Sequence, residues 1–179
     1  GYDELLAHVV SELGMRRAIV LGESFSGPLA IELAARFPER VAGLILVSTF
    51  LRSPWPPAVL RLSSVIDPRR VPRTLRRLAM LGVAGDDSLR RMFDDIVDGL
   101  APDLIAARLL QISRVDASAT LTRVRAPILA LHGRHDRLVS PREMKSALAE
   151  RLDAEFVSID GPHHGIINCS ASPLNYYQL

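Results

Sequence analysis

The stretch "LGESFSGP", residues 21–28, decides the fold, because it turns a predicted strand directly into a predicted helix. An apolar run at 18–21 leads into it, and an Ala-rich segment follows it. Such a turn crowds the backbone around its central residue, Ser24, and Gly22 and Ser26 leave the room that it needs. We expect Ser24 to adopt a strained conformation with its hydroxyl exposed at the carboxyl end of the strand. The alternative is that Ser24 or Ser26 only caps the helix.

Four short apolar runs predict the strands of one sheet. They lie at 18–21, 44–47, 128–131 and 155–159. Continuous apolar runs are typical of strands buried on both faces of a parallel sheet, whereas the last run alternates as an edge strand would. Helical patterns follow the first and third runs, one ending before Pro38 and the other capped by Ser140. The sequence therefore predicts an α/β fold, a mostly parallel sheet flanked by helices.

The segment between the second and third strands is far too long for a simple crossover. It opens with "SPWPPAVLRL", which holds three prolines. Helical patterns follow at 57–65, 72–81, 87–98 and 102–112. We interpret the segment as a helical lid inserted on one edge of the sheet. The chain then divides into a core at 1–50 and 126–179 and a lid at 51–125.

Bulk properties limit the classes of protein that fit. The chain has 179 residues, enough for one domain with a sizeable core. Its 48% of hydrophobic and 23% of charged residues are typical of a soluble globular protein, and a net charge of +2 is too small to indicate nucleic-acid binding. No apolar run approaches the roughly 20 residues of a membrane span, and we expect a cytoplasmic protein. Cys169 is the single cysteine, so no internal disulfide can form.

Two polar loops follow the third and fourth strands. The first, "HGRHDRLV", contains Asp136, and the second, "DGPHHGI", contains His163 and His164. A serine hydroxyl is a poor nucleophile unless a base takes its proton and an acid orients that base. The carboxyl ends of parallel strands meet at one edge of a sheet, so both loops should approach Ser24. In this pattern His163 is the base, with His164 as the alternative, and Asp136 is the acid unless it only stabilises its own turn.

The motifs "LGESFSGPLAIELA", "ILALHGRHDRLVS" and "DGPHH" together resemble the α/β-hydrolase family, in its branch of single-domain esterases with a helical lid. The order Ser…Asp…His along the chain is that of the family. The resemblance implies that Ser24 is the nucleophile, Asp136 the acid and His163 the base. It also implies that the backbone N–H of Phe25 is one oxyanion donor, and that no cofactor takes part.

The chain also departs from the family pattern. Ser26 stands where a glycine is commoner, and two histidines stand where one is needed. Members of the family begin with several strands and a helix upstream of Gly1, including the loop that supplies a second oxyanion N–H. We therefore expect the strand at 18–21 to lack partners on one side and the helix at 29–36 to expose apolar surface. Alone, such a chain should aggregate and be a weak enzyme.

Other residues near the predicted site have less specific roles. Glu23 is expected at the rim of the substrate pocket. The candidate pocket walls are Phe25, Phe50, Trp55 and Leu138, although each is equally suited to an ordinary core. The histidines near Asp136 lack the spacing of a zinc site, so we expect no metal.

Ester hydrolysis through an acyl-enzyme is the function that this pattern favours, on a small-molecule carboxylic ester. Thioesters, lactones and C–C bonds beside ketones are cut by the same three residues, so a thioesterase or C–C bond hydrolase is an alternative. A different class of alternative is a catalytically impaired fragment or a binding module that lacks the full oxyanion hole.

The lid is rich in arginine, with one acidic residue, Asp67, between 52 and 80. Seven arginines occupy this segment, at positions 52, 61, 69, 70, 73, 76 and 77. They form either a solvated face or a docking surface for an acidic acyl carrier protein. If they dock a carrier, reversing the charge at positions 69, 70, 73 and 76 should raise KM for carrier-bound substrate alone.

Overall fold

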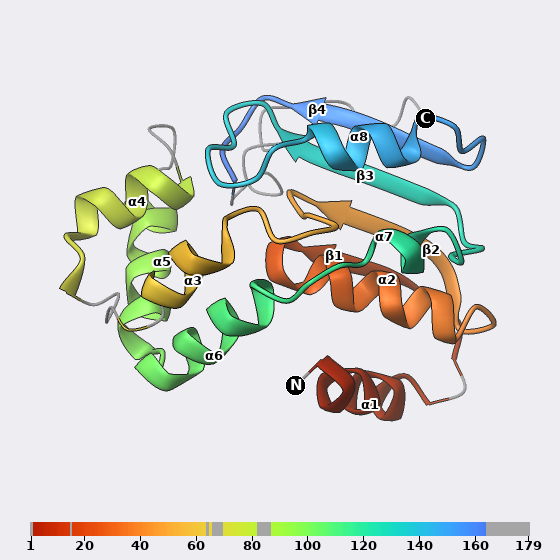
Figure 1. Ribbon diagram of the computed structural model, residues 1–179, viewed down its shortest axis with the longest axis horizontal. Coiled ribbons are helices and arrows are strands. Elements are labelled where there is room, and N and C mark those ends of the chain that lie inside the picture. The colour runs from red at the N-terminus through yellow and green to blue at the C-terminus, as the bar shows by residue number, and fades with distance from the viewer. Residues whose placement is uncertain (1, 15, 64, 66–69, 82–86, 164–179) are drawn as a thin grey trace.

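The computed structural model is an α/β structure built on one parallel sheet (Figure 1). It describes residues 2–163 except 15, 64, 66–69 and 82–86. The strands of the sheet, each one or more residues longer than its apolar run predicts, are β1 (Ala18–Glu23), β2 (Val41–Val47), β3 (Ile128–Gly133) and β4 (Ala154–Ile159). The predicted fold class is confirmed.

The four strands stand side by side in chain order, β1-β2-β3-β4. Every neighbouring pair is parallel, so all four carboxyl ends reach the same edge of the sheet. The register pairs Glu23 with Val47 and Val47 with Leu131. This alignment brings the loops after β1, β3 and β4 to one place, where the predicted site residues lie.

Helices cover one face of the sheet. They are α1 (Tyr2–Leu13), α2 (Gly27–Arg36), the short α7 (Ser118–Leu121) and α8 (Arg142–Leu148). The core lies between them and the strands, with Leu44, Leu46, Ile128 and Ala130 at most 3% exposed. Burial of this apolar surface drives the assembly.

The helix α2 follows the sequence rules closely. Glu32 accepts a hydrogen bond from Arg36 at 2.6 Å, one helical turn further along. The helix ends at Arg36, shortly before Pro38, whose ring could not continue it. The residues on its inner side, Ile31 and Ala34, are fully buried.

The expectation that the helix at 29–36 would expose apolar surface is wrong. Both α1 and α7 pack on α2 and cover it. Among the described strands, the exposed large apolar side chains belong to β1, which lies at the edge of the described sheet: Ile19 is 67% exposed and Leu21 49%.

The helices of the long segment form a separate cluster, which we call the helical insertion. They are α3 (Pro57–Ser63), α4 (Arg73–Leu81), α5 (Asp87–Gly99) and α6 (Pro102–Ile112). The sequence predicts the insertion on one edge of the sheet. It lies beyond the carboxyl ends of the strands, toward which the arrowheads point in Figure 1. The connection from β2 leaves the sheet at that end, which places the insertion next to the predicted site.

The two ends of the helical insertion are held together at the sheet. Arg52 and Asp116 form an isolated antiparallel bridge, and the N–H of Ala117 donates to the carbonyl of Leu51 at 2.8 Å. Beyond this point the chain packs in the core again, through Leu121 and its neighbours.

Ion pairs join α4 to α5 and involve several arginines of the helical insertion. Arg73, Arg76 and Arg77 all contact the carboxylate of Asp94, with Arg77 at 2.6 Å, and the first two also contact Asp98 at 2.7 and 2.9 Å. Arg76 is 7% exposed and Asp94 4%. The expected solvated face or docking surface is therefore wrong for the buried Arg76, whereas Arg73, with a side chain that is 64% exposed, remains at the surface and is paired with acidic residues after position 80. Arg69 lies outside the described residues.

Among the residues that the structure describes, no helix is both long and apolar enough to cross a bilayer.

The ion pairs between α4 and α5 make a prediction about stability. Arg76→Ala should lower the free energy of unfolding by about 1.5–3 kcal/mol, because it removes a buried guanidinium that bonds the carboxylate of Asp98 and lies beside that of Asp94. The exposed Arg70 provides the matched control, and Arg70→Ala should change it by less than about 0.5 kcal/mol. Urea unfolding followed by circular dichroism measures both. Equal effects of the two variants would contradict the structural role of Arg76.

Candidate active site

The candidate nucleophile lies in a single turn between β1 and α2. Residues Ser24–Ser26 form a 3-10 helix, η1, that joins the strand to the helix without a loop. Ser24 has a φ of 49°, in the left-handed region that residues with a side chain rarely adopt. Such strain persists only where the surroundings enforce it, and it is common at functional sites.

Two glycines make the tight turn possible. A Cβ on Gly22 would lie 2.8 Å from the Cβ of Ala30, and a Cβ on Gly27 would overlap the side chain of Thr49. Thr49 uses this space, because its hydroxyl donates a hydrogen bond of 2.6 Å to the carbonyl of Ser24. The start of α2 is thus packed directly against the residues that follow β2, and the backbone of Ser24 is held from that side.

Ser26 stabilises the turn and does not cap α2. Its hydroxyl accepts from the N–H of Glu23 at 2.9 Å and donates to the carbonyl of Glu23 at 2.8 Å. The carboxylate of Glu23 in turn accepts from the N–H of Ser26. Within the described chain, the N-cap of α2 has no side-chain hydrogen bond. The alternative that these serines only cap α2 is therefore wrong.

The structure brings Ser24, Asp136 and His163 into one hydrogen-bonded row. The hydroxyl oxygen of Ser24 lies 2.8 Å from Nε2 of His163, and Nδ1 of His163 lies 2.7 Å from Oδ2 of Asp136. The side chains of His163 and Asp136 are 2% and 0% exposed. The second histidine, His164, lies outside the described residues. In this row an imidazole can accept the serine proton while a buried carboxylate stabilises the resulting charge.

The carboxylate of Asp136 is satisfied on both oxygens. Oδ1 accepts from the N–H groups of Leu138 and Val139 at 2.8 and 3.0 Å, and Oδ2 faces His163. Burial by itself raises the pKa of Asp136. The hydrogen bond and charge of His163, together with the two backbone N–H groups, outweigh burial and hold the pKa below its ordinary value. Asp136 is therefore ionised at neutral pH.

The loops that carry Asp136 and His163 are fastened to each other. The N–H of Arg134 donates to the carbonyl of Ile159 at 2.8 Å, and the N–H of His135 donates to that of Gly161 at 2.9 Å. A Cβ on Gly133 would overlap the carbonyl oxygen of Pro162. The absence of a side chain at this position lets the histidine loop approach the acid loop.

The structure gives the positions of the proposed pocket residues but does not test their roles. Phe25 is half-buried, and the guanidinium carbon of Arg108, on α6, lies 5.5 Å from the centroid of its ring. Phe50 is 5% exposed, whereas Trp55 is 41% exposed. Leu138 is half-buried and contacts Asp136 through its N–H. Their roles in a substrate pocket stay predictions.

Sequence reasoning missed three residues that contact the site: Thr49, Arg108 and His132. Thr49 and Arg108 come from elements distant in sequence, and no local pattern marks them. His132 is visible in the sequence, directly before Gly133, but its burial at 3% exposure and its orientation toward Asp136 are tertiary facts.

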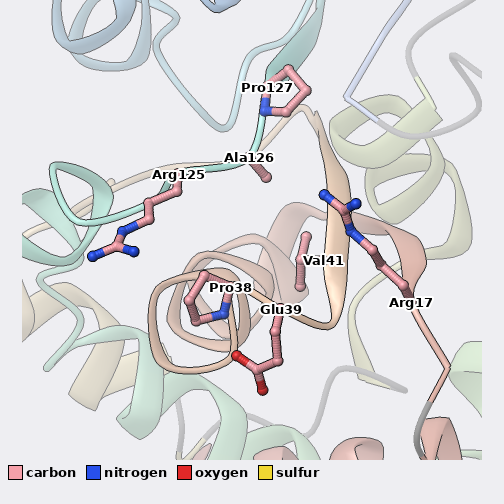
Figure 2. A pocket seen from close by; sticks show the side chains of 7 residues that line it. All are labelled: Arg17, Pro38, Glu39, Val41, Arg125, Ala126 and Pro127. Atoms are coloured by element: carbon pink, nitrogen blue, oxygen red, sulfur yellow. The ribbon is translucent and has the colours of Figure 1, made fainter.

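A cavity of about 480 Å³ lies at the other end of the sheet (Figure 2). Its lining residues precede or begin the strands, and they are Arg17, Pro38, Glu39, Val41, Arg125, Ala126 and Pro127. Because Ser24 follows the carboxyl end of β1, this cavity is not part of the candidate site. No group of three or more metal-ligating side chains gathers anywhere in the described part of the chain.

Comparison with known proteins identifies the family of the chain. A family model described as serine aminopeptidase, S33, matches residues 2–169. The chain belongs to this family of α/β hydrolases. Among solved structures, this α/β hydrolase is similar to the enol-lactonase from Burkholderia xenovorans, with a TM-score of 0.82 and 19% identity over 95% of the chain and 68% of the lactonase. At that identity the likeness shows the fold alone.

Curated relatives of this α/β hydrolase carry a more specific name. It is 32% identical to a pimeloyl-[acyl-carrier protein] methyl ester esterase of Aromatoleum aromaticum, over 82% of the chain and 66% of the relative. It is 31% identical to one of Nitrosomonas europaea, over 73% of the chain and 58% of the relative. The α/β hydrolase described here thus spans less than two thirds of the length of these relatives.

The lowered pKa of Asp136 predicts how its contribution to stability depends on pH. A carboxyl with a lowered pKa stabilises the fold above its unfolded value of about 3.8, and loses this effect as the pH falls through the folded pKa. Asp136→Asn should therefore cost about 2 kcal/mol at pH 7, the usual loss for a hydrogen bond to a buried charge, and progressively less below pH 4. Urea unfolding of both proteins between pH 3 and 7 measures the difference.

The exposed Asp160, which bonds the exposed His135, is the control for this measurement. Asp160→Asn should change the free energy of unfolding by less than about 0.5 kcal/mol. A cost of Asp136→Asn that stays constant down to pH 3 would contradict a lowered pKa.

Proposed function

We propose that the protein is a serine hydrolase that cleaves carboxylic esters through an acyl-enzyme. The single observation that carries the proposal is the row from Ser24 through His163 to a fully buried Asp136, with heavy-atom distances of 2.8 and 2.7 Å. Each side chain comes from the loop after a different parallel strand. Membership of the α/β-hydrolase family and the names of the curated relatives support the same reaction class.

The mechanism follows from the hydrogen bonds. His163 takes the proton of Ser24 at Nε2 while the serine oxygen attacks the ester carbonyl. Asp136 holds Nδ1–H of the same ring and stabilises the imidazolium that forms. His163 then gives its proton to the leaving alcohol, which departs and leaves an ester of Ser24. A water molecule, deprotonated by His163, cleaves that ester and releases the acid.

The negative oxygen of the tetrahedral intermediate would lie at the start of α2. Here the N–H of Phe25, directly after the nucleophile, is the proposed donor. The positive end of a helix dipole favours an anion at the same place. The helical insertion would act as a lid over this site, a role supported by the position of Arg108 of α6 over the Phe25 ring.

Covalent labelling tests the nucleophile. A fluorophosphonate probe should label the protein once, and Ser24→Ala should abolish both labelling and hydrolysis of p-nitrophenyl butyrate. His163→Ala should slow both by about 10³-fold or more, because the hydroxyl then lacks its base. Intact-protein mass spectrometry and absorbance assays give the two readings.

Two further serines serve as comparisons in the labelling experiment. Ser140→Ala, at an exposed position, should label at the rate of the unaltered protein. Ser26→Ala should still accept one probe molecule, because the hydroxyl of Ser26 supports the turn and does not attack the probe. Labelling that survives Ser24→Ala, or is lost only with Ser26→Ala, would overturn the assignment.

The same three side chains can also cleave thioesters, lactones and C–C bonds. A catalytically impaired chain or a binding module is the alternative of another class, and it predicts no probe labelling at all. Turnover of matched oxygen esters and thioesters by the protein without probe separates an esterase from a thioesterase.

We infer a second, narrower candidate, an ester presented on an acyl carrier protein. The observation that favours it is that several curated relatives are named as esterases of pimeloyl-[acyl-carrier protein] methyl ester. The arginines with buried ion pairs, Arg76 above all, are poorly suited to bind a carrier. The exposed arginines of the helical insertion, among them Arg70 and Arg91, are the candidates that the fold leaves for an acidic partner.

Charge reversal tests carrier docking. The pair Arg70→Glu and Arg91→Glu should raise KM for a carrier-bound ester by about 5- to 10-fold at low salt, as expected for the loss of two exposed ion pairs. KM for the same ester free in solution should not change. The effect should fade at high salt, because exposed charges are screened.

Arg17, exposed at the opposite end of the sheet, provides the matched control (Figure 2). Arg17→Glu should leave both KM values unchanged. An equal rise for the free and carrier-bound ester, or an equal effect of Arg17→Glu, would exclude docking on the helical insertion.

A further inference from the structure

A second histidine lies against the acid of the candidate site, and the proposed mechanism does not use it. His132, near the end of β3, is 3% exposed. Its Nε2 lies 3.2 Å from the carbonyl oxygen of Val139 and 3.4 Å from Oδ2 of Asp136. Oδ2 is the oxygen that also faces Nδ1 of His163. Two buried imidazoles therefore share one carboxylate oxygen.

The partner of Nε2 determines the protonation of this ring. A carbonyl oxygen is an acceptor only, so Nε2 must carry the hydrogen that it shares with Val139. His132 therefore donates from Nε2 to the carbonyl of Val139, and Oδ2 of Asp136 lies close by at 3.4 Å.

His132 is suited to stay neutral. Burial lowers the pKa of His132, and a positive charge on His163 would lower it further, although Asp136 and the carbonyl of Val139 act in the opposite direction. The net direction is below the ordinary value for histidine. A neutral His132 leaves the charge of Asp136 available to the imidazolium that His163 becomes during the reaction.

The contact of His132 extends the hydrogen bonds of the acid loop to β3. Val139 donates its N–H to Oδ1 of Asp136, and its carbonyl oxygen accepts from His132. The imidazole is itself held from the other side by Phe156 of β4, with ring centroids 6.2 Å apart and planes at 25°. The sheet thus reaches the acid loop through a rigid, buried side chain.

We propose that His132 is a positioning residue of the site, which fixes the acid loop and the Oδ2 atom of Asp136 so that this oxygen stays in line with Nδ1 of His163. The proposal rests on the proposed function, because it assigns His132 a role only if Asp136 and His163 act on Ser24. His132 does not touch the substrate. Its removal should therefore lower kcat and leave KM nearly unchanged.

Two substitutions separate positioning from simple packing. His132→Phe keeps the aromatic contact with Phe156 and removes the donor. His132→Gln keeps a donor, because the amide nitrogen of glutamine reaches the place of Nε2. For His132→Phe we expect kcat for p-nitrophenyl butyrate to fall by about 10- to 100-fold, because small misplacements of reacting groups slow a reaction by such factors. KM should stay within about twofold. The second variant should recover kcat to within about threefold of the unaltered protein.

A spectroscopic measurement reports on the same contact. The proton between Nδ1 of His163 and Asp136 gives a strongly deshielded signal in proton NMR when the hydrogen bond is short. The signal should be present in the unaltered protein and in His132→Gln, and lost or broadened in His132→Phe. Urea unfolding of each variant establishes that the fold is retained. If His132→Phe does not fold, His132→Asn takes its place, since its shorter amide cannot reach Val139.

His135 is the matched control, a histidine three residues further along the chain. It is 68% exposed and bonds Asp160 at the surface. His135→Phe and His135→Gln should both keep kcat within about twofold, as surface changes usually do. A variant without the donor at position 132 that retains full kcat and the NMR signal overturns the proposal, and so does a glutamine that fails to restore kcat.

The proposal and the proposed function fail in different ways. If the unaltered protein shows no labelling that depends on Ser24, the proposed function fails. If labelling depends on Ser24 but kcat is insensitive to the donor at position 132, the function stands and the role of His132 is excluded.

Discussion

A single carboxylate, buried without exposure to solvent, holds the candidate site together. Asp136 is stable there only because backbone N–H groups and imidazoles surround its oxygens, since an unpaired buried charge would cost far more than the fold could offset. These contacts fix the acid loop after β3 and the histidine loop after β4 relative to each other. His163, held at Nδ1, then presents Nε2 to Ser24. The geometry of the site depends on this one charge.

The backbone that permits these contacts is as specific as the side chains. Gly133 lets the carbonyl of Pro162 approach β3, and Gly22 lets α2 begin against β1. Thr49 occupies the space that Gly27 leaves and bonds the carbonyl of Ser24. Close packing of backbone against backbone thus replaces long loops, and it keeps three side chains from separate strands at fixed distances. Rigid support of this kind is what the proposed ester cleavage requires.

The helical insertion follows a different principle, that of charge pairing between helices. Its α4 carries arginines and its α5 carries aspartates, and the buried pair of Arg76 and Asp94 lies between them. Such pairs are costly to desolvate and add little net stability, but removal of one partner is expensive, so they favour one arrangement of the two helices over others. Both helices lie beyond the carboxyl ends of the strands, where the insertion can cover the site (Figure 1).

Much of this protein was determined by the sequence itself. Apolar runs marked the strands, and small residues around Ser24 marked the turn, because chain geometry and side-chain size act locally. The order Ser24, Asp136, His163 predicted which loops meet, since parallel strands share one carboxyl edge. Only the tertiary structure decided the rest. From the sequence alone, the arginines of α4 resemble a free basic surface, because their partners Asp94 and Asp98 lie in the next helix, α5. Likewise, His132 looked like an ordinary histidine until folding placed its ring against Asp136, because burial and hydrogen-bond partners depend on contacts that sequence distance does not encode.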